Sequence, residues 1–324
     1  MLPRRAWLAG GAAFAALPAS ARAEGSSWPS QPIRLVVPFA PGGTTDLAAR
    51  LVSQGLGARL GQPVIVENRP GAGATLGAAQ VALAAPDGLT LLVSNIASHG
   101  IAPSLYRELR YDPMRDFTHI ALLIETPSVF VANPRFAPPD LPAVVRLSQE
   151  RSQGLDIASS GSGSSNHLLI VQFGQMTGAR VNHVPYRGAG PAMTDVISDV
   201  VPMMSDSLPS ASGHLRAGVV RGMAVATAAR HPAFPALPTF REQGVDLVAN
   251  SWFGISGPAG LPPAVTERLS REISLLLAQP ELQSRFAELG GLVSPLSPAA
   301  YGEFIAGEVA RWAPLVQASG ARVE

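Results

Sequence analysis

The sequence of 324 residues contains neither cysteine nor lysine. Without cysteine the chain can form no disulfide bond, thiolate metal site, iron–sulfur cluster, cysteine nucleophile or lipid anchor on an N-terminal cysteine. All 24 basic residues are arginines, and they are spread along the chain without the dense run that a nucleic-acid-binding surface needs. Charged residues make up 15% of the chain and hydrophobic residues 47%, so we expect a sizeable folded core and no nucleic-acid partner.

The sequence also lacks the common catalytic and cofactor motifs. Its six histidines form no HxxxH or HExxH pair, which argues against a zinc site. GAGATLG at residues 71–77 has Leu76 where a dinucleotide-binding fingerprint needs its third glycine or an alanine, and there is no P-loop. The serines of GSGSS at residues 161–165 lack the flanking glycines of a nucleophile elbow. We therefore predict no cofactor and no metal, while a Ser–His–Asp triad assembled from distant residues stays open.

Residues 1–23 have the pattern of an export signal. Arg4 and Arg5 precede a 12-residue apolar stretch, and residues 21–23 (Ala-Arg-Ala) fit a small-x-small cleavage site. The apolar stretch is shorter than the roughly 20 residues of a membrane-spanning helix. RRAWL also resembles the twin-arginine export motif, so both export routes stay open. Cleavage would remove three arginines and change the formal charge from +1 to −2. We predict an exported soluble protein.

The rest of the chain alternates strand-like and helix-like segments. Residues 33–39 (IRLVVPF) form a β-branched apolar run, and residues 46–60 carry leucines at helical spacing. Residues 63–68 and 89–95 are expected to be the next two strands, with an alanine-rich helix between them. This βαβαβ order predicts an α/β fold with mostly parallel sheets flanked by helices.

Three times a strand is followed by a loop of small residues that opens a helix. Ligands of open parallel sheets bind beyond the carboxyl ends of the strands, where these loops lie. The start of a helix presents unpaired N–H groups and the positive end of the helix dipole, so it suits an anion.

The first such loop is PGGTTD, after the strand at residues 33–39. Gly42 and Gly43 would let the backbone approach a ligand, and Thr44 and Thr45 would add hydroxyl donors. We expect Asp46 to be the N-cap of the helix. An ordinary tight turn is the alternative interpretation.

The other two loops lie in the second half of the βα pattern. SSGSGSSNHL at residues 159–168 is a dense set of small donors beside a helix start, although such a composition is also typical of a flexible linker. VPYRGAGPAMTD at residues 184–195 adds Tyr186, a hydroxyl donor, and Arg187, a natural partner of a carboxylate. Both side chains could equally be ordinary surface groups. Ser94 and Asn95, which end the third strand, would face the same rim.

Six motifs resemble one family. In chain order they are PIRLVVPFAPGGTTDLAAR, VIVENRPGAGATLGAAQVALAAPDGLTLL, IASSGSGSSNHL, HVPYRGAGPAMTDV, ALPTFREQGV and SWFGISGPAGLP. They are similar to the solute-binding proteins of tripartite tricarboxylate transporters, the Bug family, from about Trp28 to the C-terminus. The resemblance implies a two-lobed periplasmic binding protein (type II) that closes on a small organic acid without catalysis.

The resemblance also implies where the lobes and the site lie. Lobe 1 is expected to comprise residues 24–127 and 228–324, lobe 2 residues 128–227, and the hinges residues 125–128 and 226–230. The ligand would lie in the cleft between the lobes. Together the loops and the resemblance predict these ligand-binding residues: Phe39, Ala40, Gly43, Thr44, Thr45, Asp46, Ser94, Asn95, Ser160, Gly161, Gly163, Ser164, Ser165, His167, Tyr186, Gly188 and Asp206.

The sequence departs from the family pattern at two places. Arg187 stands where the family commonly has lysine, which keeps the charge but changes the donor geometry. VVPMMSDSL stands where a Gly-x-Val/Ile-Asp-like turn is usual, and its Asp206 would lie near the pocket.

Three functions remain in view. The first is a periplasmic carboxylate-binding protein, expected to be a monomer, that delivers its ligand to integral-membrane permease subunits. The second is an exported hydrolase with a dispersed Ser/His/Asp site. The third is a ligand-sensing partner of a signalling receptor, which would share the fold and the pocket. The missing catalytic motifs favour binding over catalysis.

Overall fold

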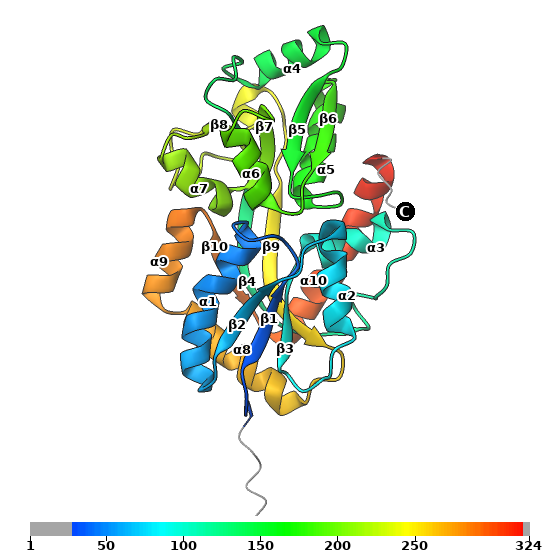
Figure 1. Ribbon diagram of the computed structural model, residues 1–324, viewed down its shortest axis with the longest axis vertical. Coiled ribbons are helices and arrows are strands. Elements are labelled where there is room, and N and C mark those ends of the chain that lie inside the picture. The colour runs from blue at the N-terminus through cyan, green and yellow to red at the C-terminus, as the bar shows by residue number, and fades with distance from the viewer. Residues whose placement is uncertain (1–27, 320–324) are drawn as a thin grey trace, which may run out of the picture.

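The computed structural model describes residues 28–319, so the export signal predicted at residues 1–23 lies outside the described residues. Figure 1 shows two bodies, one above the other, which we call lobe 1 and lobe 2. They are joined by two long strands, β4 (Phe117–Ala132) and β9 (Asn250–Pro258). None of the helices within residues 28–319 is long and apolar enough to cross a membrane.

Lobe 1 holds the first part of β4, most of β9 and four further strands. These four are β1 (Ile33–Val37), β2 (Val64–Asn68), β3 (Thr90–Asn95) and β10 (Leu292–Leu296). Its helices are α1 (Thr44–Leu60), α2 (Thr75–Ala82), α3 (Ala102–Leu105), α8 (Pro263–Leu277), α9 (Pro280–Leu289) and α10 (Pro298–Ser319), with the short turns η1 (Ala72–Ala74) and η2 (Ile96–Ile101).

Lobe 2 holds the end of β4 and four strands that follow it in the chain. These are β5 (Leu155–Ser159), β6 (Val181–Pro185), β7 (Met203–Ser207) and β8 (Arg221–Val225). Its helices are α4 (Leu141–Glu150), α5 (Ser165–Thr177), α6 (Ala189–Ile197) and α7 (Leu208–Arg216), with the turn η3 (Arg241–Gln243). The strands form one path across both lobes, in the order β2-β1-β3-β9-β4-β7-β5-β6, and β8 and β10 also pair with β4.

The strand directions make the two lobes face each other. In lobe 1, β1 pairs in parallel with β2 and β3, and β9 runs antiparallel to both β3 and β4. Strands β1, β2 and β3 therefore run in the direction of β4, which leads into lobe 2. In lobe 2, β7 and β8 run antiparallel to β4, and β5 runs parallel to β6 and β7. The carboxyl ends of both strand sets thus point at the opposite lobe.

The predicted α/β two-lobed class is confirmed, and the sheets are mixed in detail. The parallel pairs join the strands that carry the loops of small residues, as expected. Strands β4, β9 and β10 form antiparallel pairs that the sequence pattern did not indicate.

Helix α1 illustrates why the predicted elements form. Ala48, Val52, Leu56 and Leu60 follow one another at intervals of four residues and are all buried. The helix ends at Gly61, whose φ of 76° is a left-handed conformation that favours glycine. Its buried stripe packs in the lobe 1 core with β1 and α8. Lobe 2 has a core on each face of its sheet.

The chain crosses between the lobes at a ladder of backbone hydrogen bonds. Ser128 N–H donates to Ala249 O (3.0 Å), Ala249 N–H to Ala226 O (3.0 Å) and Ala226 N–H to Ser128 O (2.8 Å). Phe240 and Val245 pack in the lobe 2 core, beyond the sequence-based boundary at residues 227 and 228. We therefore propose that the chain returns to lobe 1 at residues 249–250.

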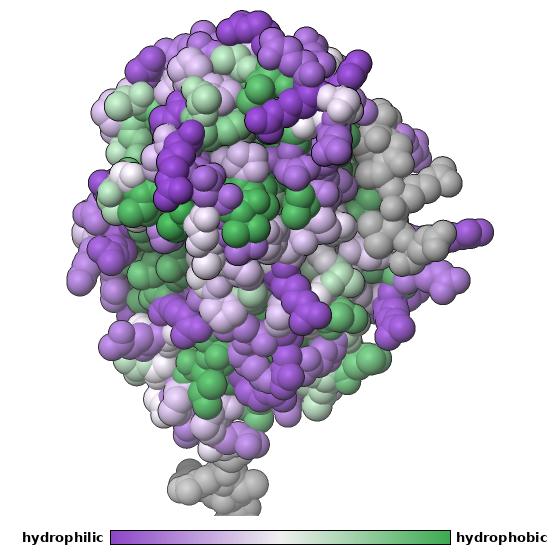
Figure 2. All heavy atoms as spheres, turned by 45° about the horizontal axis from the view of Figure 1, so that its top comes forward, coloured by the Kyte–Doolittle hydropathy of each residue, from purple (hydrophilic) through white to green (hydrophobic). Residues whose placement is uncertain are grey.

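The surface carries no single dominant apolar patch on the face shown in Figure 2, where hydrophobic residues (green) are interspersed with hydrophilic ones (purple). Such scattered apolar residues are normal for a folded protein.

Candidate ligand-binding site between the lobes

A buried cavity of about 30 Å³ lies where the loops of the two lobes meet. This volume holds no more than a few water molecules. The residues that line it are Phe39, Gly43, Thr44, Thr45, Asn95, Ile96, Ala97, Ser160, Ser164, Ser165, Asn166, Ala189, Asp206, Ser207, Ser251 and Phe253. They are small, polar or aromatic, and they come from both lobes.

The lobe 1 wall is the start of α1. The N-cap is Gly43, with no side-chain cap, so the first N–H groups of the helix have no capping partner from that residue. The hydroxyls of Thr44 and Thr45 lie in the first turn, and both residues are buried. Gly42, with φ of 88°, makes the turn that a residue with a side chain would strain.

Asp46 is not the N-cap, contrary to the prediction. It lies one turn later and accepts hydrogen bonds from Gly42 N–H (3.1 Å) and Asn68 Nδ2 (3.0 Å), and its ion partner is Arg50. Burial would raise the pKa of Asp46, but the hydrogen bonds from Arg50, Asn68 and Gly42 outweigh burial, so its pKa lies below the ordinary value. The carboxylate therefore holds the loop in shape and does not line the cavity.

The first lobe 2 wall is the start of α5. Its N-cap Ser164 accepts from His167 N–H (3.2 Å) and donates to Gly161 O (2.7 Å). Asn166 Nδ2 donates to Ser160 Oγ (3.1 Å), while its Oδ1 is buried and has no hydrogen-bond partner within residues 28–319. This segment therefore presents side chains and the positive end of a helix to the cavity.

The second lobe 2 wall is the end of β7 and the start of α7. Asp206, only 1% exposed, accepts at Oδ1 from Ser207 N–H (2.7 Å) and from Ser210 Oγ (2.7 Å). Its Oδ2 has no hydrogen-bond partner among the described residues. Burial raises the pKa of Asp206 to about 7, against the opposing effect of the hydrogen bonds from Ser210 and Ser207.

Direct contacts between the lobes close the cavity. Thr44 Oγ1 donates to Ser210 Oγ (3.1 Å) and accepts from Ser210 N–H (3.2 Å). Ala40 N–H donates to Arg187 O (3.0 Å). A Cβ built on Gly188 would lie 2.9 Å from Ala40 N, so glycine is needed for this approach. The structure is thus the closed arrangement of the two lobes.

Nine predicted residues line this cavity and eight do not. Those at the cavity are Phe39, Gly43, Thr44, Thr45, Asn95, Ser160, Ser164, Ser165 and Asp206. Those elsewhere are Ala40, Asp46, Ser94, Gly161, Gly163, His167, Tyr186 and Gly188.

The residues that lie elsewhere have other partners. Successive strand residues point to opposite faces, so Asn95 meets the cavity while Ser94 Oγ bonds to Tyr301 OH (2.9 Å) in the core. His167 stacks on His183 with ring centroids 3.9 Å apart. Tyr186 OH donates to Asp195 Oδ2 (2.7 Å).

Seven lining residues are absent from the predicted set. They are Ile96, Ala97, Asn166, Ala189, Ser207, Ser251 and Phe253. Four of them adjoin predicted residues, so widening each motif by one position would have found them: Ile96, Asn166, Ala189 and Ser207. Ser251 and Phe253 lie on β9, whose antiparallel direction brings its first residues to the rim. No sequence pattern indicated that direction.

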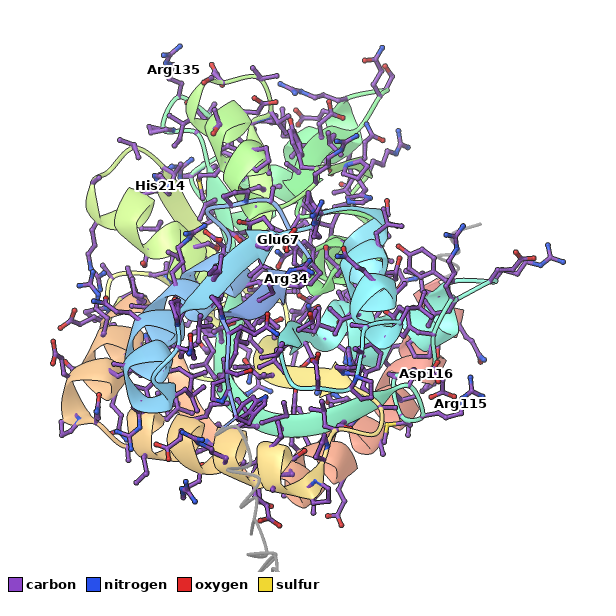
Figure 3. All side chains as sticks on the ribbon, turned by 60° about the horizontal axis from the view of Figure 1, so that its bottom comes forward. Arg34, Glu67, Arg115, Asp116, Arg135 and His214 are labelled. Atoms are coloured by element: carbon purple, nitrogen blue, oxygen red, sulfur yellow. The ribbon has the colours of Figure 1, made fainter. Side chains whose placement is uncertain are left out.

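The cavity has an unusual charge composition for an anion site. Its lining contains no arginine and no histidine, and Asp206 is its one ionisable side chain. Arginines pair with carboxylates away from the cavity, as Figure 3 shows for Arg34 with Glu67 and for Arg115 with Asp116. Hydrogen-bond donors and helix starts, not cationic side chains, would therefore hold an anion here.

Two serine–histidine pairs exist, and neither lines the cavity. Ser256 Oγ lies 3.1 Å from His119 Nδ1, and Ser159 Oγ lies 2.6 Å from His183 Nε2. Burial lowers the pKa of His119 to about 4 and that of His183 to about 3. Both rings are therefore weak bases at neutral pH, and no ion pair with a carboxylate is recorded for either within residues 28–319.

A family model described as the tripartite tricarboxylate transporter family receptor matches residues 48–321. The chain belongs to this receptor family. The resemblance seen in the six sequence motifs is thereby confirmed, and the family is one of periplasmic solute-binding proteins. Protein BugT of Bordetella pertussis is 35% identical over 300 residues, which cover 92% of each chain.

Two solved structures of the family's kind are also similar to this chain. MatC from Rhodopseudomonas palustris with bound malate is 35% identical, with a TM-score of 0.85 over 89% of this chain and 100% of that one. Rpa4515 from R. palustris with adipate is 31% identical, with a TM-score of 0.88 over 91% of this chain and 100% of that one. Each likeness extends over both lobes of the receptor fold.

Proposed function

We propose that this receptor-family protein captures a small organic acid between its lobes in the periplasm and delivers it to the permease subunits of a tripartite transporter. One observation carries the proposal: the starts of α1, α5 and α7 converge on a single buried cavity. Each start brings N–H groups and a positive dipole end, and together they can hold carboxylate groups from both sides. The malate and adipate of the two similar structures support the same ligand class.

Capture requires the lobes to part. A cavity of about 30 Å³ is too small for a four-carbon acid, so a ligand enters when the loops separate and widens the site. The acid then bridges loops of both lobes, and the closed form gains contacts that the open form lacks. We propose that the movement occurs where β4 and β9 cross between the lobes.

Catalysis is not part of this proposal. The two serine–histidine pairs lie away from the cavity, and their imidazoles are poor general bases. We therefore propose binding without turnover, by a monomer. A signalling partner in place of a permease would leave the pocket chemistry unchanged, and identifying the membrane protein that copurifies with the loaded receptor separates the two.

A thermal-shift screen tests the proposal. The mature chain is heated with succinate, malate or adipate, and with sodium chloride or a neutral sugar as controls. At about a hundred times the Kd, an acid that binds the native state adds about 2.7 kcal/mol, which raises the Tm by about 5 °C or more. If every acid leaves the Tm at the chloride value, the proposal is wrong.

A matched pair of variants ties the binding to the cavity. Thr45→Ala removes a buried hydroxyl at the cavity and should weaken binding about three- to tenfold. Thr194→Ala removes an exposed threonine hydroxyl on α6, outside the cavity, and should leave the affinity unchanged. Equal losses in both variants would contradict the site assignment.

A further inference from the structure

Asp206 presents an unusual group to an anion site. It is the one ionisable side chain in the cavity lining, it is 1% exposed, and its Oδ2 has no hydrogen-bond partner within residues 28–319. A buried carboxyl oxygen without a partner is costly unless a ligand or a proton satisfies it. Oδ2 is therefore the atom of Asp206 that remains available to a bound molecule.

The elements packed around Asp206 bring no compensating charge. On α1, Asp46 and Arg50 pair with each other, and Thr44 is the residue that reaches Ser210 beside Asp206. The paired segment of β4 places Val129 opposite Asp206. The basic residues of α7 are His214 and Arg216, which lie in its last turn, at the end away from Asp206. Figure 3 shows His214 at that far end.

Elements further along lobe 2 bring none either. On α5 and β6, the neutral rings of His167 and His183 stack on each other, because burial lowers the pKa of both. Tyr186, in the loop before α6, donates to Asp195. No cation is therefore available to neutralise both Asp206 and a ligand carboxylate.

The hydrogen bonds of Asp206 decide which oxygen would carry a proton. Oδ1 already accepts from Ser207 N–H and Ser210 O–H, so a proton resides on Oδ2. Burial has already raised the pKa of Asp206 to about 7. A ligand carboxylate placed beside it would raise that pKa further, because like charges in one site disfavour a second ionisation.

We propose that Asp206 enters the complex as a neutral carboxylic acid, whose Oδ2–H donates to a carboxylate oxygen of the bound organic acid. This deepens the proposed function and rests on it: Asp206 selects an ionised carboxyl group on the lobe 2 side and admits it with one proton. The reaction is association of the carboxylate with the protonated side chain, so above neutral pH the complex takes that proton from solvent.

The proton is measured directly on the unmodified mature chain. Succinate and adipate are the probes, because neither carries a hydroxyl or amino group and both are ionised above about pH 6. Calorimetric titrations at about pH 8, in two buffers of different ionisation enthalpy, should report uptake of close to one proton per ligand. The affinity should be flat at low pH and fall about tenfold per pH unit above the Asp206 midpoint.

Two variants sharpen the result. D206N keeps an oxygen to accept from Ser207 and Ser210 and places an NH₂ donor where Oδ2–H would be. It should bind the same probe within about tenfold of the unmodified chain at neutral pH, with no proton uptake and no fall at high pH. Ser210→Ala removes a hydrogen bond that favours the ionised form, so the affinity midpoint should move to higher pH.

Each other outcome overturns the inference. A probe that binds with pH-independent affinity and no proton uptake refutes the neutral Asp206 while leaving the proposed function intact. If malate binds while succinate and adipate do not, and D206N loses malate, Asp206 acts as an ionised acceptor instead. If no acid raises the Tm at any pH, the proposed function itself fails.

Discussion

Two buried aspartates stand on opposite sides of the cavity, and their surroundings differ sharply. Asp46 in lobe 1 accepts from Gly42 and Asn68 and pairs with Arg50, and its pKa is lowered. Asp206 in lobe 2 has partners on Oδ1 alone, no cation beside it, and a raised pKa. The first carboxylate is fully used in shaping its own loop. The second keeps a free oxygen at the cavity, which teaches that the two lobes divide the tasks of scaffold and recognition.

The largest expected effect concerns pH and Asp206. Its folded pKa of about 7 exceeds the model value of 3.8, so the folded chain holds a proton that the unfolded chain releases between about pH 4 and pH 7. The ligand-free protein should therefore lose stability as pH rises through this window. D206N should abolish this loss and gain up to about 4 kcal/mol relative to the unmodified chain at about pH 8. Urea unfolding at several pH values measures it, and parallel curves for both chains would break the comparison.

The next effect concerns Asp46. Asp46→Ala leaves Gly42 N–H and the Asn68 amide without their acceptor in a buried loop, which should cost about 2–3 kcal/mol of unfolding free energy at neutral pH. Asp246→Ala is the matched control, because that carboxylate is exposed and pairs with exposed Arg241. The control should change stability by less than about 1 kcal/mol. Equal losses in urea unfolding would show that Asp46 is not a scaffold residue.

The contribution of Asp46 also depends on pH, with the opposite sign to that of Asp206. Because its folded pKa is lowered, its stabilisation is present above the unfolded pKa and is lost as pH falls below about 4. The destabilisation caused by Asp46→Ala should therefore shrink in acid.

The smallest effect concerns the contact that joins the two sides. Thr44→Val keeps the shape of the side chain but removes both hydrogen bonds to Ser210, so the closed form should lose about 1 kcal/mol relative to the open form. The affinity for an acid found by the screen should fall about fivefold. Ser212→Ala, which removes a hydroxyl of α7 that bonds only within its own helix, should bind normally. An unchanged affinity for Thr44→Val would exclude this contact from closure.

Much of the fold was predictable because it depends on local patterns. The apolar run at residues 33–39 and the leucine spacing at residues 46–60 correspond to β1 and α1, within two residues at each end. The long strand β4 was predicted only from residue 128 onward, because Pro127 interrupts an otherwise apolar run. In the structure this proline lies where β4 passes from one lobe to the other and pairs with the first residue of β9.

The site was predictable in its location and only partly in its residues. The loops of glycine, serine and threonine marked the carboxyl ends of β1 and β5, and nine predicted residues line the cavity. Sequence alone could not show that Asp46 faces its own loop, because that depends on Asn68 from the neighbouring strand. Nor could it show that Ser251 reaches the rim, because that depends on the direction of β9. Both facts are set by pairing between distant segments.

The backbone ladder of Ser128, Ala226 and Ala249 sets how the molecule can move. A loose tether would let two bodies drift apart in any direction. A ribbon of paired strands bends far more easily about one axis than it stretches or shears. Loading and release would then retrace a single path, and the mouth that a membrane partner meets would have the same shape at every cycle.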